Sequence, residues 1–150
     1  MPVELRNEQR ALRIDVPHLK GAAEKLLRGV GRPGAALSIL ITDDRRIAWL
    51  HEEWMGEDSP TDVLSFSQRA GNGSPRGGPA SQLLGDVVIS AETAQRCSPR
   101  DPMREILRYL VHGVLHLIGH DHVKSADRLR MDRETARLIG LLRKGSGDDL

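Results

Sequence analysis

Four of the six histidines of this 150-residue chain fall within residues 112–122. His112 and His116 are four residues apart, and side chains at that spacing lie on the same face of a helix, with Cβ atoms about 5–6 Å from each other. From this separation two imidazoles can reach one zinc ion at Zn–N distances of about 2.0–2.1 Å. The spacing therefore predicts a metal-binding pair carried by a helix.

A third histidine follows where that helix should end. In a continuing helix, His122 would lie about a turn and a half beyond His116 and would be rotated away from it. Gly119 permits a turn in between, because glycine enters the left-handed region without a Cβ clash. We therefore predict that His112, His116 and His122 bind one Zn²⁺ and leave a fourth position open, as catalytic zinc sites do. His120 is the alternative third ligand, or a residue that supports the ligands.

Composition and charge exclude several other classes of protein. The one cysteine, Cys97, excludes an intramolecular disulfide and a multi-cysteine zinc finger, and it favours a reducing compartment. Lys and Arg number 22 against 21 Asp and Glu, and this balance excludes a polybasic nucleic-acid coat and an acidic tail. Neither a signal peptide nor the roughly 18 apolar residues of a membrane span is visible. We expect a soluble, cytoplasmic protein with no membrane partner and no DNA partner.

Hydrophobic periodicity predicts the elements that must position the histidines. Strands are expected over 35–41, 63–66 and 84–90, and helices over 16–30, from about 44 onward, and over 92–96, 102–118 and 125–142. The Gly-, Ser- and Pro-rich segment 67–82 is expected to be a flexible loop, and 145–150 a frayed tail. The alternation of strands and helices predicts one α/β (α+β) domain over 1–150, a small mixed four-stranded sheet with helices packed around it.

Three local expectations concern packing and capping. In the helix predicted over 102–118, the apolar residues form one broad stripe, and His112 and His116 project away from it. The strand predicted over 35–41 is almost continuously apolar, which is typical of burial on both faces. Thr42 or Asp43 is expected to cap the helix that follows this strand.

The pattern His-x-x-x-His-x-x-Gly-x-x-His is similar to the helix of metzincin metallopeptidases. Those peptidases carry a glutamate, their general base, directly after the first histidine, and Gly113 stands there in this chain. Together with Pro60–Phe66 (PTDVLSF) and Leu84–Ile89 (LGDVVI), the stretch from His112 to His122 resembles instead the YbeY family of bacterial rRNA maturation endoribonucleases.

This resemblance implies a zinc-dependent, single-strand-specific endoribonuclease that acts in rRNA maturation and in 30S ribosome quality control. It also implies that His112, His116 and His122 hold the zinc, and that ribosomal RNA and the small ribosomal subunit are the partners. The chain departs from the family pattern at Met55, where an arginine is expected, and at His120, where the family often has tyrosine.

Phosphodiester cleavage is compatible with Gly113, because zinc can polarise a phosphoryl oxygen and lower the pKa of bound water without a neighbouring glutamate. Asp121, Asp62 and Asp86 are candidate catalytic helpers. Each also has a structural interpretation, because aspartates are common in turns and at the ends of helices and strands.

Binding of RNA requires local positive charge. Residues 100–144 contain ten Lys and Arg and six Asp and Glu, and Arg104 and Arg128 are candidate RNA-binding residues. A solvated helix face explains these arginines equally well, and the aromatic content of 3% argues against extensive base stacking. Two alternatives therefore remain: a zinc hydrolase of another substrate class, and a non-catalytic, zinc-stabilised ribosome-assembly factor.

Overall fold

The computed structural model describes residues 3–55, 63–67, 83–118 and 125–144. The elements follow the order β1 (Val3–Asn7), α1 (Val16–Gly29), β2 (Ala36–Thr42), α2 (Asp44–Met55), β3 (Val63–Ser67), β4 (Leu83–Ser90), α3 (Ala91–Cys97), α4 (Pro102–Leu117) and α5 (Ser125–Lys144). The loop predicted over 67–82 lies outside the described residues except for Ser67, and so does the tail predicted over 145–150.

The four strands form one mixed sheet, as the sequence predicted, and their order in it is β1-β2-β4-β3. β1, β2 and β4 are parallel, and β3 pairs antiparallel with β4. The sequence placed three of these strands but not β1, in which Val3 is fully buried whereas Glu4 and Arg6 are exposed. Charged side chains are common on such edge strands, and they hide the strand from a search for apolar runs.

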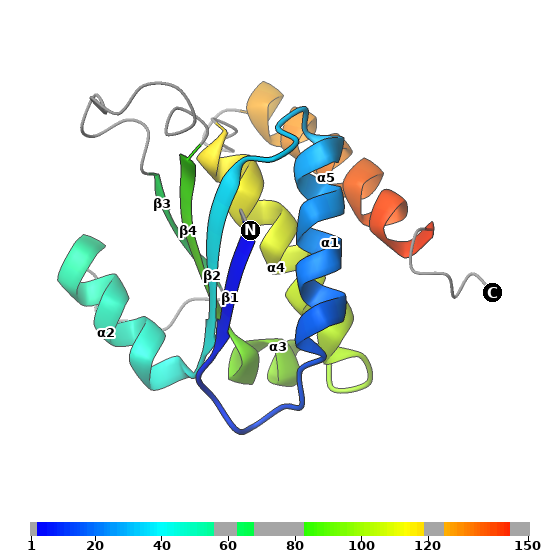
Figure 1. Ribbon diagram of the computed structural model, residues 1–150. Coiled ribbons are helices and arrows are strands. Elements are labelled where there is room, and N and C mark those ends of the chain that lie inside the picture. Colours follow the sequence, from blue (N-terminus) through cyan, green and yellow to red (C-terminus); the bar gives the residue numbers. More distant parts are fainter. Residues whose placement is uncertain (1–2, 56–62, 68–82, 119–124, 145–150) are drawn as a thin grey trace.

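Helices cover the two faces of the sheet unequally. Figure 1 shows α1, α4 and α5 on one face and α2 on the other. The main core lies on the three-helix side, where α1 and α4 pack on the sheet and α5 packs on these two helices. The sheet contributes Leu37, Ile39, Ile41, Val87 and Ile89 to this core. On the other face, Ile47 of α2 forms a smaller buried cluster with Leu64 and Val88.

This unequal cover corrects one expectation. β2 was expected to be buried on both faces, but its burial alternates: Leu37, Ile39 and Ile41 are buried, whereas Ser38 and Leu40 are partly exposed. The expectation is wrong because α2 covers only part of the outer face. The strand is therefore one-sided, with a period of two.

Aspartates begin the helices on both faces. The backbone N–H of Arg46 donates a hydrogen bond of 2.8 Å to the side chain of Asp43, so Asp43 rather than Thr42 caps α2. Asp101 accepts in the same way from the N–H of Arg104 at 3.2 Å and caps α4, the histidine helix. These caps satisfy N–H groups that have no partner inside a helix.

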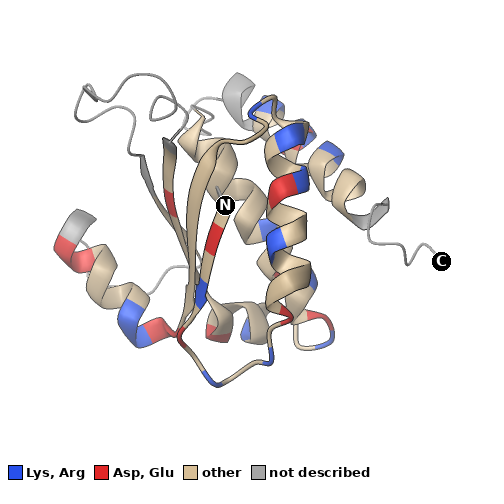
Figure 2. Cartoon of the chain, viewed as in Figure 1, with Lys and Arg blue, Asp and Glu red and all other residues tan. Residues whose placement is uncertain are grey.

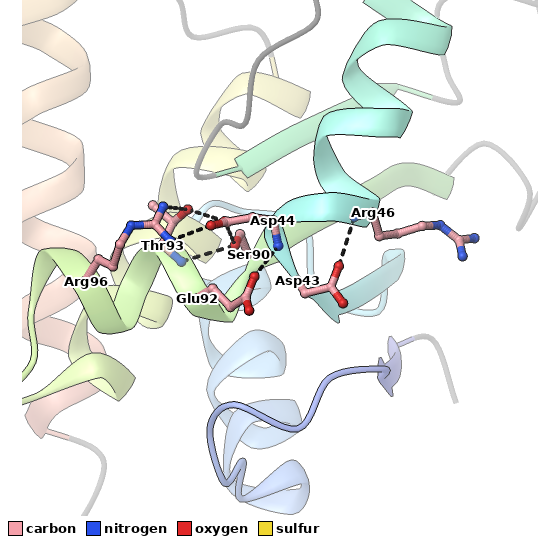
Figure 3. A network of polar contacts seen from close by, with 7 residues as sticks. All are labelled: Asp43, Asp44, Arg46, Ser90, Glu92, Thr93 and Arg96. Carbon is pink, nitrogen blue, oxygen red and sulfur yellow. Dashed lines mark hydrogen bonds and ion pairs between the residues drawn. The ribbon is translucent and has the colours of Figure 1, made fainter.

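Asp44, the first residue of α2, ties this helix to α3 (Figure 3). The hydroxyls of Ser90 and Thr93 donate to Asp44 Oδ1 at 2.5 and 2.7 Å, and Arg96 forms an ion pair with Asp44 Oδ2. In return, the N–H of Asp44 donates to Glu92 at 2.8 Å. Burial disfavours the charged form of Asp44, but the hydrogen bonds from Ser90, Arg96 and Thr93 outweigh it, so its pKa lies below the usual value.

We predict that Asp44→Asn lowers the free energy of unfolding at pH 7 by about 1 kcal/mol, because the ion pair with the exposed Arg96 is lost. A carboxyl whose pKa is lowered by folding stabilises the fold above its unfolded pKa, near 4, and this contribution disappears as the pH falls through the folded pKa. The free energies of unfolding of wild type and Asp44→Asn, measured in urea, should therefore differ at pH 7 and converge in strong acid.

Asp43→Asn is the control, since asparagine caps a helix as well as aspartate. A difference that persists in strong acid would contradict the role given to the Asp44 charge.

Candidate functional site

His112 and His116 lie in the last two turns of α4. His112 is partly buried and His116 is exposed, whereas Ile106, Leu110 and Val114 of the same helix are fully buried in the main core. The prediction that the histidines lie off the apolar stripe is confirmed. Both imidazoles are thus carried by a helix that the core holds, but neither is needed to fill that core.

Gly113, between the two histidines, is the point at which the backbone of α4 touches the sheet. A Cβ atom added to Gly113 would lie 2.7 Å from Cγ1 of Val87 and 3.4 Å from Oγ of Ser65. Ser65 Oγ donates a hydrogen bond of 3.1 Å to the carbonyl oxygen of Gly113. A glutamate like that of the metzincin peptidases would collide with the sheet at this position, so the glycine is required by packing. Sequence reasoning recognised the missing glutamate but not this contact.

Glu105 contributes a negative charge on the histidine side of α4. Arg108 donates to its carboxylate at 2.6 Å, and this bond holds the pKa of Glu105 below its usual value against the effect of burial. The hydroxyl of Tyr109 and the charge of His112 act in the same direction. An ionised carboxylate near His112 favours a cation there. The sequence placed Glu105 beside the histidines but gave it no role.

Asp86, a candidate helper, lies on the other face of the sheet. Successive side chains of a strand point to opposite faces, and Val87 faces Gly113 of α4. Asp86 lines instead a groove of about 470 Å³ between the sheet and α2, together with Arg6, Arg46 and Leu50. The structure therefore does not bring Asp86 together with the two histidines.

Arg104 is exposed in the first turn of α4. It precedes His112 by eight residues, which is about 12 Å along the helix axis. Arg128 belongs to α5 and Met55 ends α2, but their side chains are outside the described part of the chain.

The third ligand also lies outside the described residues. The same holds for the alternative ligand His120 and for the helpers Asp62 and Asp121. Among the side chains that are described, no three His, Cys, Asp or Glu form a group able to hold a metal ion. Binding of zinc through His122 therefore stays a prediction, for which α4 provides two of the three imidazoles.

Charges of both signs are interspersed along the helices, as Figure 2 shows. Two of the arginines counted between residues 100 and 144 form ion pairs within their own helix, Arg108 with Glu105 and Arg137 with Glu134. Part of the local positive charge is thereby neutralised, as expected of a solvated helix face.

Comparisons with known proteins identify the family. The family model described as endoribonuclease YbeY matches residues 4–143. The chain is 45% identical over 141 residues to an endoribonuclease YbeY of Anaeromyxobacter sp., covering 92% of this chain and 70% of that protein. It is 34% identical over 149 residues to that of Geobacter metallireducens, covering 96% and 97%. The solution structure of TM1509 from Thermotoga maritima has the same fold, with a TM-score of 0.64 at 20% identity, over 98% of this chain and 92% of that one.

We predict that Gly113→Ala lowers the free energy of unfolding by about 1–3 kcal/mol, because the new methyl group overlaps the stiff, fully buried Val87. The control is Gly140→Ala in α5, where a Cβ would meet nothing within 4 Å. That substitution should stabilise the protein by about 0.5–1 kcal/mol, the difference in helix propensity. Urea unfolding measures both, and equal effects of the two substitutions would refute the close contact at Gly113.

Proposed function

Because this chain belongs to the endoribonuclease YbeY family, we propose that it is a zinc-dependent, single-strand-specific endoribonuclease that acts in rRNA maturation and in 30S ribosome quality control. One observation supports the choice of chemistry in particular. His112 and His116 stand side by side off the core of α4, and the position between them that carries the general base in metzincin peptidases has no room for a side chain. RNA cleavage is thus favoured over peptide hydrolysis.

The described residues fit a zinc ion as donors. His112 and His116 offer two imidazoles at the spacing that one zinc requires, and the Glu105 carboxylate adds negative charge near His112. His122 is the proposed third ligand, with His120 as its alternative. When bound, zinc would supply Lewis-acid polarisation of a phosphodiester and would make water a better nucleophile near neutral pH.

The chain's own residues have three tasks in this mechanism. The two histidines of α4 hold the ion, and the contact at Gly113 holds α4 against the sheet. Asp121 and Asp62 are proposed to orient a ligand or to accept a proton. Asp86 is left out of this group, because it faces the groove on the opposite side of the sheet.

The proposed substrate is single-stranded ribosomal RNA, and the proposed partner is the small ribosomal subunit in the cytoplasm. Arg104 and Arg128 are proposed to contact phosphates, and weak RNA affinity is expected because Met55 replaces the arginine of the family pattern. In the described segments, no helix has the length and hydrophobicity needed to span a bilayer.

We predict that His116→Ala abolishes cleavage of a single-stranded ribosomal RNA fragment. The loss should exceed the 10–100-fold that is typical when a residue supporting a ligand is removed, because a ligand itself is lost. The exposed His116 contributes little to the core, so the free energy of unfolding of the metal-free protein should change by less than about 0.5 kcal/mol. The measurement compares wild type, His116→Ala and the control His18→Ala, an exposed histidine at the start of α1, each with and without a chelator.

Equal cleavage by wild type and His116→Ala would point to a contaminating nuclease. The non-catalytic assembly factor would then be the better account. Cleavage of peptides or amides that depends on His116, without cleavage of RNA, would instead favour a zinc hydrolase of another substrate class.

A further inference from the structure

The contact at Gly113 is made by two residues that face each other across neighbouring strands. Ser65 of β3 pairs with Val87 of β4 in the antiparallel register, so both side chains point to the same face of the sheet. Val87 provides the surface that the glycine touches, and Ser65 donates the hydrogen bond to its carbonyl oxygen. This bond joins segments that are 48 residues apart in the chain.

The two contacts restrict α4 in different ways. Val87 fixes how closely the helix approaches the sheet, because its β-branched side chain is stiff and fully buried. A glycine has no side chain to lock between neighbours, however, so its contact with Val87 adds little resistance to sliding or rotation at this turn of α4 beyond that of the surrounding core. The carbonyl of Gly113 has two lone pairs, and the bond from Ser65 can add a direction to this contact.

The two histidines are placed so that they share any movement at this point. At about 100° per residue, His112 lies about 100° from Gly113 around the helix and His116 about 60° from it on the same side. At a side-chain radius of about 5–6 Å, a rotation of α4 by 10° moves both imidazoles by about 1 Å. Zinc–ligand distances in proteins lie within about 0.2 Å of their standard values. Because a rotation of α4 carries both imidazoles relative to a ligand outside this helix, even a small rotation weakens binding of an ion held by all three.

We propose that Ser65 is a positioning residue for the metal site. Its hydrogen bond to the carbonyl oxygen of Gly113 sets the rotation and the axial position of the helical turn 112–116, which carries both histidines. This inference rests on the proposed zinc-dependent function, and it assigns a role to a strand residue that is not itself a ligand. Ser65 is partly buried and accessible to substitution without disturbing the centre of the core.

The test compares zinc affinity among variants of the full chain, measured by competition with a chromophoric chelator. Ser65→Ala removes the hydroxyl, and Ser65→Thr and Ser65→Val form a pair of the same shape that differ in that hydroxyl. The control is Ser38→Ala on β2, whose side chain lines the groove on the opposite face of the sheet. Urea unfolding of the metal-free proteins measures the structural effect separately.

We expect Ser65→Ala and Ser65→Val to lower zinc affinity about tenfold or more, the low end of the effect of residues that support metal ligands. Ser65→Thr and Ser38→Ala should stay within about twofold of wild type by the same measure. The visible absorption of bound Co²⁺, which reports ligand geometry, should change in the Ala and Val variants and not in the Thr variant.

Equal zinc affinity of Ser65→Thr and Ser65→Val would overturn the inference, whatever their stabilities, and would leave the proposed function intact. If Ser65→Ala does not fold, the comparison of Ser65→Thr with Ser65→Val still tests the inference, because these two side chains fill the same space. A wild type that binds no zinc would instead refute the proposed function, and the inference with it.

Discussion

The structure depends on the direct contact between the backbone of α4 and the sheet at Gly113. Without a Cβ atom there, the helix approaches Val87 closely enough that even a methyl group would overlap it. The antiparallel edge strand β3 pairs with β4 in a register that places Ser65 beside Val87, and Ser65 donates a hydrogen bond to the carbonyl oxygen of Gly113. The histidines at 112 and 116 lie on either side of this fixed point in the chain. Any movement of α4 at this contact therefore moves both histidines.

The contact at Gly113 also shows which side chains of β4 face each side of the sheet. Because Val87 points toward α4, its neighbours Asp86 and Val88 must point toward α2. The face with α1, α4 and α5 carries the main core and the histidines, and the other face carries a partly open groove. α2 is held beside that groove through Asp44, whose carboxylate is bound by Ser90, the N-cap of α3, and by Thr93 and Arg96 of that helix.

Most of the fold could be predicted from the sequence, because helices and central strands carry their own apolar periodicity. β1 could not, since an edge strand with one fully buried side chain and exposed charges lacks that signal. The spacing of His112 and His116 was enough to predict that one helix carries both, and their position off its apolar stripe is confirmed. The role of Gly113 was not predictable, because its partners Ser65 and Val87 are distant in the chain. The side of the sheet to which Asp86 points was not predictable either, because it depends on which face of β4 is covered by α4.

We propose that residues 112–116 of α4 help to bind a zinc ion that keeps one coordination position open for chemistry. Anomalous X-ray diffraction at the zinc absorption edge, on crystals of the full chain grown with zinc, would locate this ion. We expect one strong peak about 2.0–2.1 Å from nitrogen atoms of His112 and His116, with a third histidine as ligand and no fourth protein ligand. A peak away from α4, or a zinc with a fourth protein side chain as ligand, would refute the proposed catalytic zinc site.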